Sequence, residues 1–190
     1  MKFEDLPFLW KIQRQKGYSV YNRIHYLSTQ RSLPVTFRSY EIRRVSIPQP
    51  LISKEKEMFD VGRHKRSGGE LRVSNLERTL VDVLDRPELC GSWEEIWRSL
   101  ASIEFFDIEQ VIDYVLLLGN ATTAAKVGFF LEQRREDLMV EDSHLKQLRE
   151  LRPHQPHYLL RGKRKHGRWI KNWNLMVPDE ILNQTWGEVL

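Results

Sequence analysis

The segment formed by residues 71–91, LRVSNLERTLVDVLDRPELCG, constrains the fold of this chain more than any other stretch. It begins with a short apolar alternation typical of a strand, after which Ser74 and Glu77 have the spacing of a helix capping box. Pro87 ends the helix that follows, because proline disfavours helical geometry in the residue before it. The apolar residues in between repeat at helical spacing, which predicts a helix buried along one face: Leu76, Leu80, Val83 and Leu84.

The polar residues of this helix have two interpretations. Arg78 and Asp82 lie one turn apart on a second face and can form an ion pair. In the structural interpretation, which we favour, Arg78 pairs with Asp82 or with another acid. Glu77 then completes the cap and Thr79 braces a turn. In the functional alternative, Arg78 or Asp82 faces a groove that binds a partner.

Composition excludes several classes of protein. With 190 residues, of which 41% are hydrophobic, the chain suits one domain with a buried core, with or without a small appendage. Cys90 is the only cysteine, which excludes an intramolecular disulfide, and we expect a small buried residue in a reducing compartment. The longest apolar run, near residues 115–118, is far shorter than the roughly 20 residues of a membrane span. The amino-terminal segment lacks the apolar region of a signal peptide, so we predict a cytoplasmic protein.

Periodicity predicts strands in the first part of the chain. Residues 33–47 are rich in β-branched and aromatic side chains and lie between Pro34 and Pro48, which predicts one or two strands. The other elements expected before Ser74 are short helical pieces over 3–29, a loop or strand edge over 49–57, and strands 58–61 and 70–73 around a basic turn, 62–69.

Helices are expected in the middle of the chain and strands again at its end. The helices are the one after Ser74, one after a second capping box at Ser92 and Glu95, one from Asp107 to Gly119, one over 122–137, and one around Leu148 that ends at Pro153. Strands 157–160 and 168–177 are predicted to form a hairpin around the basic turn 161–167, followed by short helical turns at 178–182 and 185–188. The predicted fold is therefore a single α+β domain with amino-terminal antiparallel strands, about five helices and a carboxy-terminal β-hairpin.

The stretch VSNLERTLVDVLDRPELCGSWEEIW resembles a motif of the AbiEi-type antitoxins, the regulators of type IV toxin–antitoxin pairs linked to abortive phage infection. Ser92 stands where a second glycine is common in that family. Two later blocks, 125–133 and 173–186, resemble further family blocks in the same order, so the likeness covers roughly residues 33–188. The matching motif positions are Glu77, Arg78, Thr79, Leu80, Asp82, Asp85, Arg86, Pro87, Glu88, Gly91, Glu94 and Glu95.

This resemblance implies an antitoxin or regulatory module that acts by binding and not by catalysis. It implies a helical segment or linker remnant over 1–32 and an AbiEi-like carboxy-terminal domain over 33–190. Many family members begin with a DNA-reading winged helix, for which the residues before the first expected strand are too few. The implied functional partner is a nucleotidyltransferase-like toxin, without a stable direct complex being implied, and no cofactor is expected.

Two basic stretches are candidates for contact with nucleic acid, and the net charge of +4 permits such contact without requiring it. Phosphate contact would make this chain a non-specific nucleic-acid-binding module, our alternative function. Trp169 lies beside the second stretch and could stack on a base or pack in the core. The opposing interpretation is that both stretches are solvated hairpin tips. The candidate residues are Arg63, Lys65 and Arg66 in the first stretch, and Arg161, Lys163, Arg164, Lys165 and Arg168 in the second.

No catalytic or metal-binding motif stands out. Asp60, Glu70 and Arg72 form a string like that of metal-dependent nucleases, but arginine replaces the lysine and cannot act as a base. The histidines lack zinc-site spacing, and phosphate-binding glycine motifs and nucleophile elbows are absent. We therefore predict no catalytic residue, metal or cofactor, while the aromatic residues near the amino terminus leave room for a homodimer.

Overall fold

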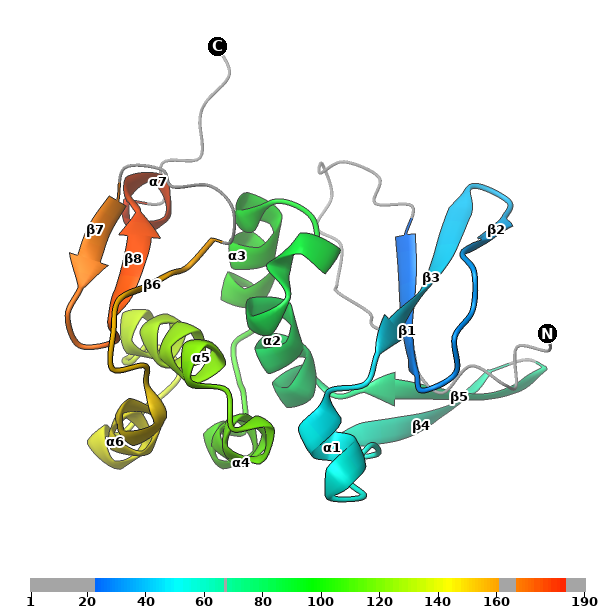
Figure 1. The fold of residues 1–190 in the computed structure, drawn as a ribbon, viewed down its shortest axis with the longest axis horizontal. Helices are drawn as coiled ribbons and strands as arrows, with labels where there is room; N and C mark the ends of the chain where they lie inside the picture. Colours follow the sequence, from blue (N-terminus) through cyan, green and yellow to red (C-terminus); the bar gives the residue numbers. More distant parts are fainter. Residues whose placement is uncertain (1–22, 67, 161–166, 184–190) are drawn as a thin grey trace, which may run out of the picture. The chain divides into compact units, whose positions relative to one another are not determined.

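The computed structural model of the chain describes residues 23–66, 68–160 and 167–183 (Figure 1). Within these ranges the fold is mixed α+β, with strands first, helices in the middle and strands at the end, which confirms the predicted class. The chain divides into two compact units, residues 1–79 and 80–190, and the boundary falls inside helix α2 (Leu76–Asp85).

A three-stranded mixed sheet opens the first unit. Strand β3 (Tyr40–Ser46) lies in the middle, with β2 (Val35–Phe37) antiparallel on one side and β1 (Arg23–Ser28) parallel on the other. Tyr26 and Ile42 are buried together at its core. The predicted strands within 33–47 are confirmed, but the helical prediction for 23–28 is wrong. This segment is a strand because β3 supplies its backbone hydrogen bonds, and three consecutive residues, His25, Tyr26 and Leu27, are buried in it.

Helix α1 (Gln49–Ser53) occupies the stretch for which we expected a loop or strand edge, so that prediction is also wrong. Its first turn contains Pro50, a position where the missing backbone N–H of proline costs nothing. After α1 the chain forms a hairpin from β4 (Val61–Arg66) and β5 (Gly69–Ser74), with Gly68 between them at φ 103°. The basic turn predicted over 62–69 is therefore wrong, since its basic residues lie along strand β4.

Helix α2 begins one residue later than the sequence suggested. Ser74 remains in β5, paired with Val61, and the side chain of Asn75 accepts the backbone N–H of Arg78 at 3.0 Å. Asn75 thus takes the capping position predicted for Ser74, because the strand holds Ser74 in its ladder. The helix start was thus predicted to within one residue, but the capping residue is asparagine and not the predicted serine.

Helices form most of the second unit. The capping box of Ser92 and Glu95, the cap at Asp107 and the left-handed Gly119 at φ 62° are all present as predicted. The fourth predicted helix is shorter than expected and begins after Asn120, whose side chain caps it. The helical elements are a 3-10 turn η2 (Pro87–Leu89), α3 (Trp93–Ala101), α4 (Ile108–Leu118), α5 (Ala121–Gln133) and α6 (Asp142–Leu151).

The carboxy-terminal strands pair differently from the prediction. Strand β8 (Leu175–Pro178) lies between β6 (His157–Tyr158), which is parallel to it, and β7 (Gly167–Ile170), which is antiparallel. The chain turns at Asn174, in the left-handed region at φ 48°, so the strand expected over 168–177 is in fact a hairpin. The short helix α7 (Asp179–Leu182) follows as predicted. The predicted turn over 161–166 and the helical turn at 185–188 lie outside the described residues.

Helix α5 packs against the hairpin through one aromatic ring. Trp173 is completely buried, and a Cβ atom added to Gly128 of α5 would lie inside van der Waals contact with its ring. The indole N–H of Trp173 donates to Glu132 Oε2 at 2.7 Å, and Glu132 Oε1 accepts Arg149 Nη2 of α6 at 2.7 Å. The space that Gly128 leaves on α5 is therefore filled by a side chain.

Candidate functional site

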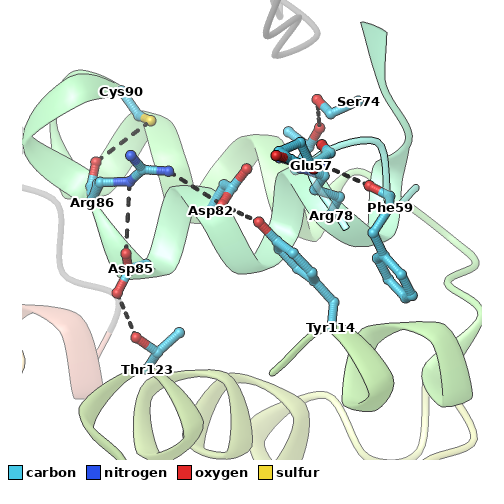
Figure 2. A network of polar contacts seen from close by, with 11 residues as sticks. Glu57, Phe59, Ser74, Arg78, Asp82, Asp85, Arg86, Cys90, Tyr114 and Thr123 are labelled. Atoms are coloured by element: carbon cyan, nitrogen blue, oxygen red, sulfur yellow. Dashed lines mark hydrogen bonds and ion pairs between the residues drawn. The ribbon is translucent and has the colours of Figure 1, made fainter. Parts of the chain in front are cut away.

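Arg78, in the first unit, is a buried charge of the predicted motif. Its side chain is completely buried, and Nη1 donates to the backbone carbonyl oxygens of Glu57 at 2.8 Å and Phe59 at 2.6 Å (Figure 2). Both carbonyls belong to the turn that precedes β4. A buried cation is costly unless polar groups replace its water, and the two carbonyls do so here. Their hydrogen bonds to Arg78 hold this turn against the start of α2.

Two further motif residues lie at the same helix end. The hydroxyl of Thr79 donates to the backbone carbonyl of Asn75 at 2.6 Å and lies 2.8 Å from the hydroxyl of Ser74. Thr79 therefore braces the junction between strand β5 and the helix. Glu77 is half-buried in the first turn, where its charge favours the positive end of the helix dipole, but the cap itself is Asn75.

Asp82 lies in the second unit and is also completely buried. Its Oδ1 atom accepts the hydroxyl of Tyr114, from α4, at 2.9 Å and Nη2 of Arg86 at 3.3 Å. Arg86 Nε lies 3.6 Å from the carboxylate of Asp85, which also accepts the hydroxyl of Thr123 from α5 (Figure 2). These bonds connect the last turns of α2 to α4 and α5.

Lys126 and Cys90 complete the polar interior of the second unit. Lys126 is buried on α5, and its ammonium group donates to the backbone carbonyl of Leu84 at 3.1 Å. Cys90 is buried as predicted, and burial raises the pKa of its thiol. A protonated thiol is a poor nucleophile, so Cys90 is suited to packing and not to covalent chemistry.

The motif residues therefore contribute to the interior of each unit. Arg78 and Thr79 bind backbone and side chains of the first unit, while Asp82 accepts hydrogen bonds inside the second. Sequence reasoning found these residues but missed Asn75 and Tyr114, because neither lies at a motif position with a chemical pattern of its own. In the part of the chain that the structure describes, no three His, Cys, Asp or Glu side chains gather as ligands for a metal ion.

The basic candidates lie in both units. On β4, Arg63 and Lys65 are exposed, and Arg66 is the last residue of that strand. Arg168 lies on β7 with 68% of its side chain exposed, 4.0 Å from the carboxylate of Asp179. The remaining candidates lie outside the described residues: Arg161, Lys163, Arg164 and Lys165. Trp169, on β7, is half exposed, so it is not a core residue.

The nuclease-like string is spread over two structural settings. Asp60 lies in the turn before β4 with φ 51°, and its backbone carbonyl accepts the N–H of Asn75 at 2.9 Å. Glu70 and Arg72 lie on β5, where Glu70 is 3.6 Å from Arg63.

In the part of the chain that the structure describes, no helix has both the length and the apolar character of a membrane span.

Comparison with known proteins adds no relative. No family model matches the chain, and no curated protein sequence matches it. The likeness to AbiEi-type antitoxins therefore depends on the motif residues and the two later sequence blocks alone.

Proposed function

We propose that this chain is the antitoxin or regulatory module of a bacterial toxin–antitoxin system of the AbiEi type. The observation that carries the proposal is the order of its sequence blocks, from Glu77 through Glu95 to the later blocks at 125–133 and 173–186. The module works in the cytoplasm by binding, without a cofactor, and counters a toxin that resembles a nucleotidyltransferase.

The burial of the motif residues is compatible with this proposal and limits where the binding surface lies. The contacts of Arg78 and Asp82 described above lie inside their own units, so both residues preserve the fold that displays the surface. Because both side chains are buried, a partner has to be recognised by exposed residues. This places the search for antitoxin determinants on the strands and loops outside α2.

The test is co-expression of the full chain with the nucleotidyltransferase-like toxin encoded beside it. We expect bacterial growth, arrested by the toxin alone, to recover when the chain is present. The variant Arg78→Met, which should be destabilised, is expected to restore growth less well, and Lys146→Gln on the exposed surface of α6 is the matched control that should restore growth like the wild type. Continued growth arrest with a folded, equally abundant wild-type chain would overturn the proposal.

A further inference from the structure

One face of the β4–β5 hairpin carries a concentrated positive charge. Residues directly opposite each other in an antiparallel pair share a face, and the register places Arg63 opposite Arg72 and Lys65 opposite Glu70. All four side chains are exposed, with 71% of the Arg63 side chain open to solvent. We call these three cations and their face the basic face of the hairpin.

A single acid lies on this face and does not neutralise it. Glu70 lies 3.6 Å from Arg63, and both side chains are largely exposed, so their ion pair is weak. Lys65 and Arg72 add two further positive charges, which leaves the basic face with an excess of cations. The opposite face of the hairpin contains the half-buried Leu71 and Val73 together with the exposed His64.

The charge of the whole unit reinforces this face. Residues 1–79 contain 16 lysines and arginines against 8 aspartates and glutamates, whereas residues 80–190 contain 14 against 18. The modest net charge of the chain thus conceals a basic unit and an acidic one. A unit with this excess attracts a polyanion and accelerates its encounter.

We propose that the basic face of the hairpin binds the phosphate backbone of double-stranded DNA without reading its sequence. This goes beyond the antitoxin proposal and does not depend on it. A two-stranded ribbon fits the major groove of B-form DNA, whereas the major groove of A-form RNA is too narrow. Single strands are held largely by stacking of their bases on aromatic side chains. The other described positions on this face, Val61 and Ser74, are not aromatic, so the face suits a duplex better than a single strand. Arginine and lysine contacts to phosphate position a protein but carry no sequence information.

The test is a fluorescence-polarisation titration of the full chain with a labelled duplex of about 30 base pairs at two salt concentrations. Three phosphate contacts predict a loss of affinity of roughly 40-fold when salt rises from about 50 to about 200 mM. The triple variant Arg63→Gln, Lys65→Gln, Arg72→Gln should bind more weakly at low salt and lose that part of the salt dependence. Glu70→Gln should bind more tightly, because it removes the one carboxylate from the face.

The matched control is the triple variant Lys163→Gln, Arg164→Gln, Lys165→Gln, which removes the same charge from the second basic stretch. We expect it to keep the salt dependence that the hairpin variant loses. Unchanged thermal unfolding of both variants verifies their fold. Wild-type affinity in the hairpin variant, loss of binding confined to the control variant, or equal affinity for a single strand or for duplex RNA would each overturn the proposal.

Discussion

Arg78 carries a positive charge where solvent does not reach, and the carbonyl groups of Glu57 and Phe59 replace part of its lost hydration. Arg78→Met keeps an unbranched, flexible side chain but removes the guanidinium group, which leaves both carbonyls without this donor. We expect the free energy of unfolding to fall by about 2–5 kcal/mol, measured by urea denaturation. Arg135→Met, at a half-exposed ion pair, should cost less than about 1 kcal/mol. An unchanged melting temperature together with lost toxin neutralisation would favour the partner-binding interpretation of Arg78.

A substitution at Tyr114 tests how much its hydrogen bond to the buried carboxylate of Asp82 stabilises the second unit. Its hydroxyl donates to Asp82 at 2.9 Å, and Tyr114→Phe removes this donor while leaving the ring in place. We expect a loss of about 1–3 kcal/mol in unfolding free energy, since a buried acceptor loses a partner. Tyr158→Phe, at an exposed ring, is the control and should be nearly neutral. Equal stability of both variants would show that this hydrogen bond contributes nothing to the fold.

The ring of Trp173 leaves no space for a side chain at Gly128. Alanine normally stabilises a helix by up to about 1 kcal/mol relative to glycine, but here its methyl group would overlap the buried indole. We expect Gly128→Ala to destabilise the protein by about 1–3 kcal/mol and to alter the near-ultraviolet circular dichroism of the tryptophans. The second change Trp173→Leu should remove the clash, so the double variant should be more stable than the sum of the two single effects predicts. A stabilised single variant would contradict this packing.

At the level of elements, local signals were read correctly and distant pairing was not. The caps at Ser92, Asp107 and Gly119 depend on residues within one turn, so the sequence contains the whole signal. Strand β1 becomes a strand because β3, far along the chain, supplies its hydrogen bonds, and β6 depends on β8 in the same way. A pattern confined to one segment cannot reveal such partners. The same limit explains why Ser74 was taken for a cap although the ladder of β5 holds it.

The cap of α4 gives this element a pH dependence. The backbone N–H of Gln110 donates to the carboxylate of Asp107 and, with the Gln110 side chain, lowers the pKa of Asp107 below its ordinary value of 3.8. A lowered pKa means that the ionised cap stabilises the fold above that value and that this contribution disappears as pH falls through the folded pKa. Asp107→Asn keeps a good cap without the charge, so it should be less stable than wild type at pH 7 and approach it in acid, as the pH falls through the lowered folded pKa. Urea denaturation at both pH values measures this, and a constant difference would contradict the assignment.

The whole molecule combines a basic unit with an acidic one. The sequence predicts only part of the candidate surface on the basic unit. The sequence pointed to Arg63 and Lys65, but it placed them in a turn. Only the strand register shows that Arg72, first considered as part of a nuclease-like string, lies opposite Arg63 on the same face. The division inside α2 likewise depends on packing and not on a linker in the sequence, so the opposite charges of the units became visible only with the structure.

Parallel pairing of β1 with β3 has a practical consequence for anyone who shortens this protein. The sequence suggests cutting near residue 32, yet that cut removes Arg23–Ser28 with the buried Tyr26 and Leu27 and bares the backbone of β3. A bared strand edge recruits strands from other copies. We expect the protein lacking residues 1–32 to aggregate, with light scattering that grows with concentration, whereas the full chain does not. A clear solution of the shortened protein with unchanged urea denaturation would show that β3 needs no such partner.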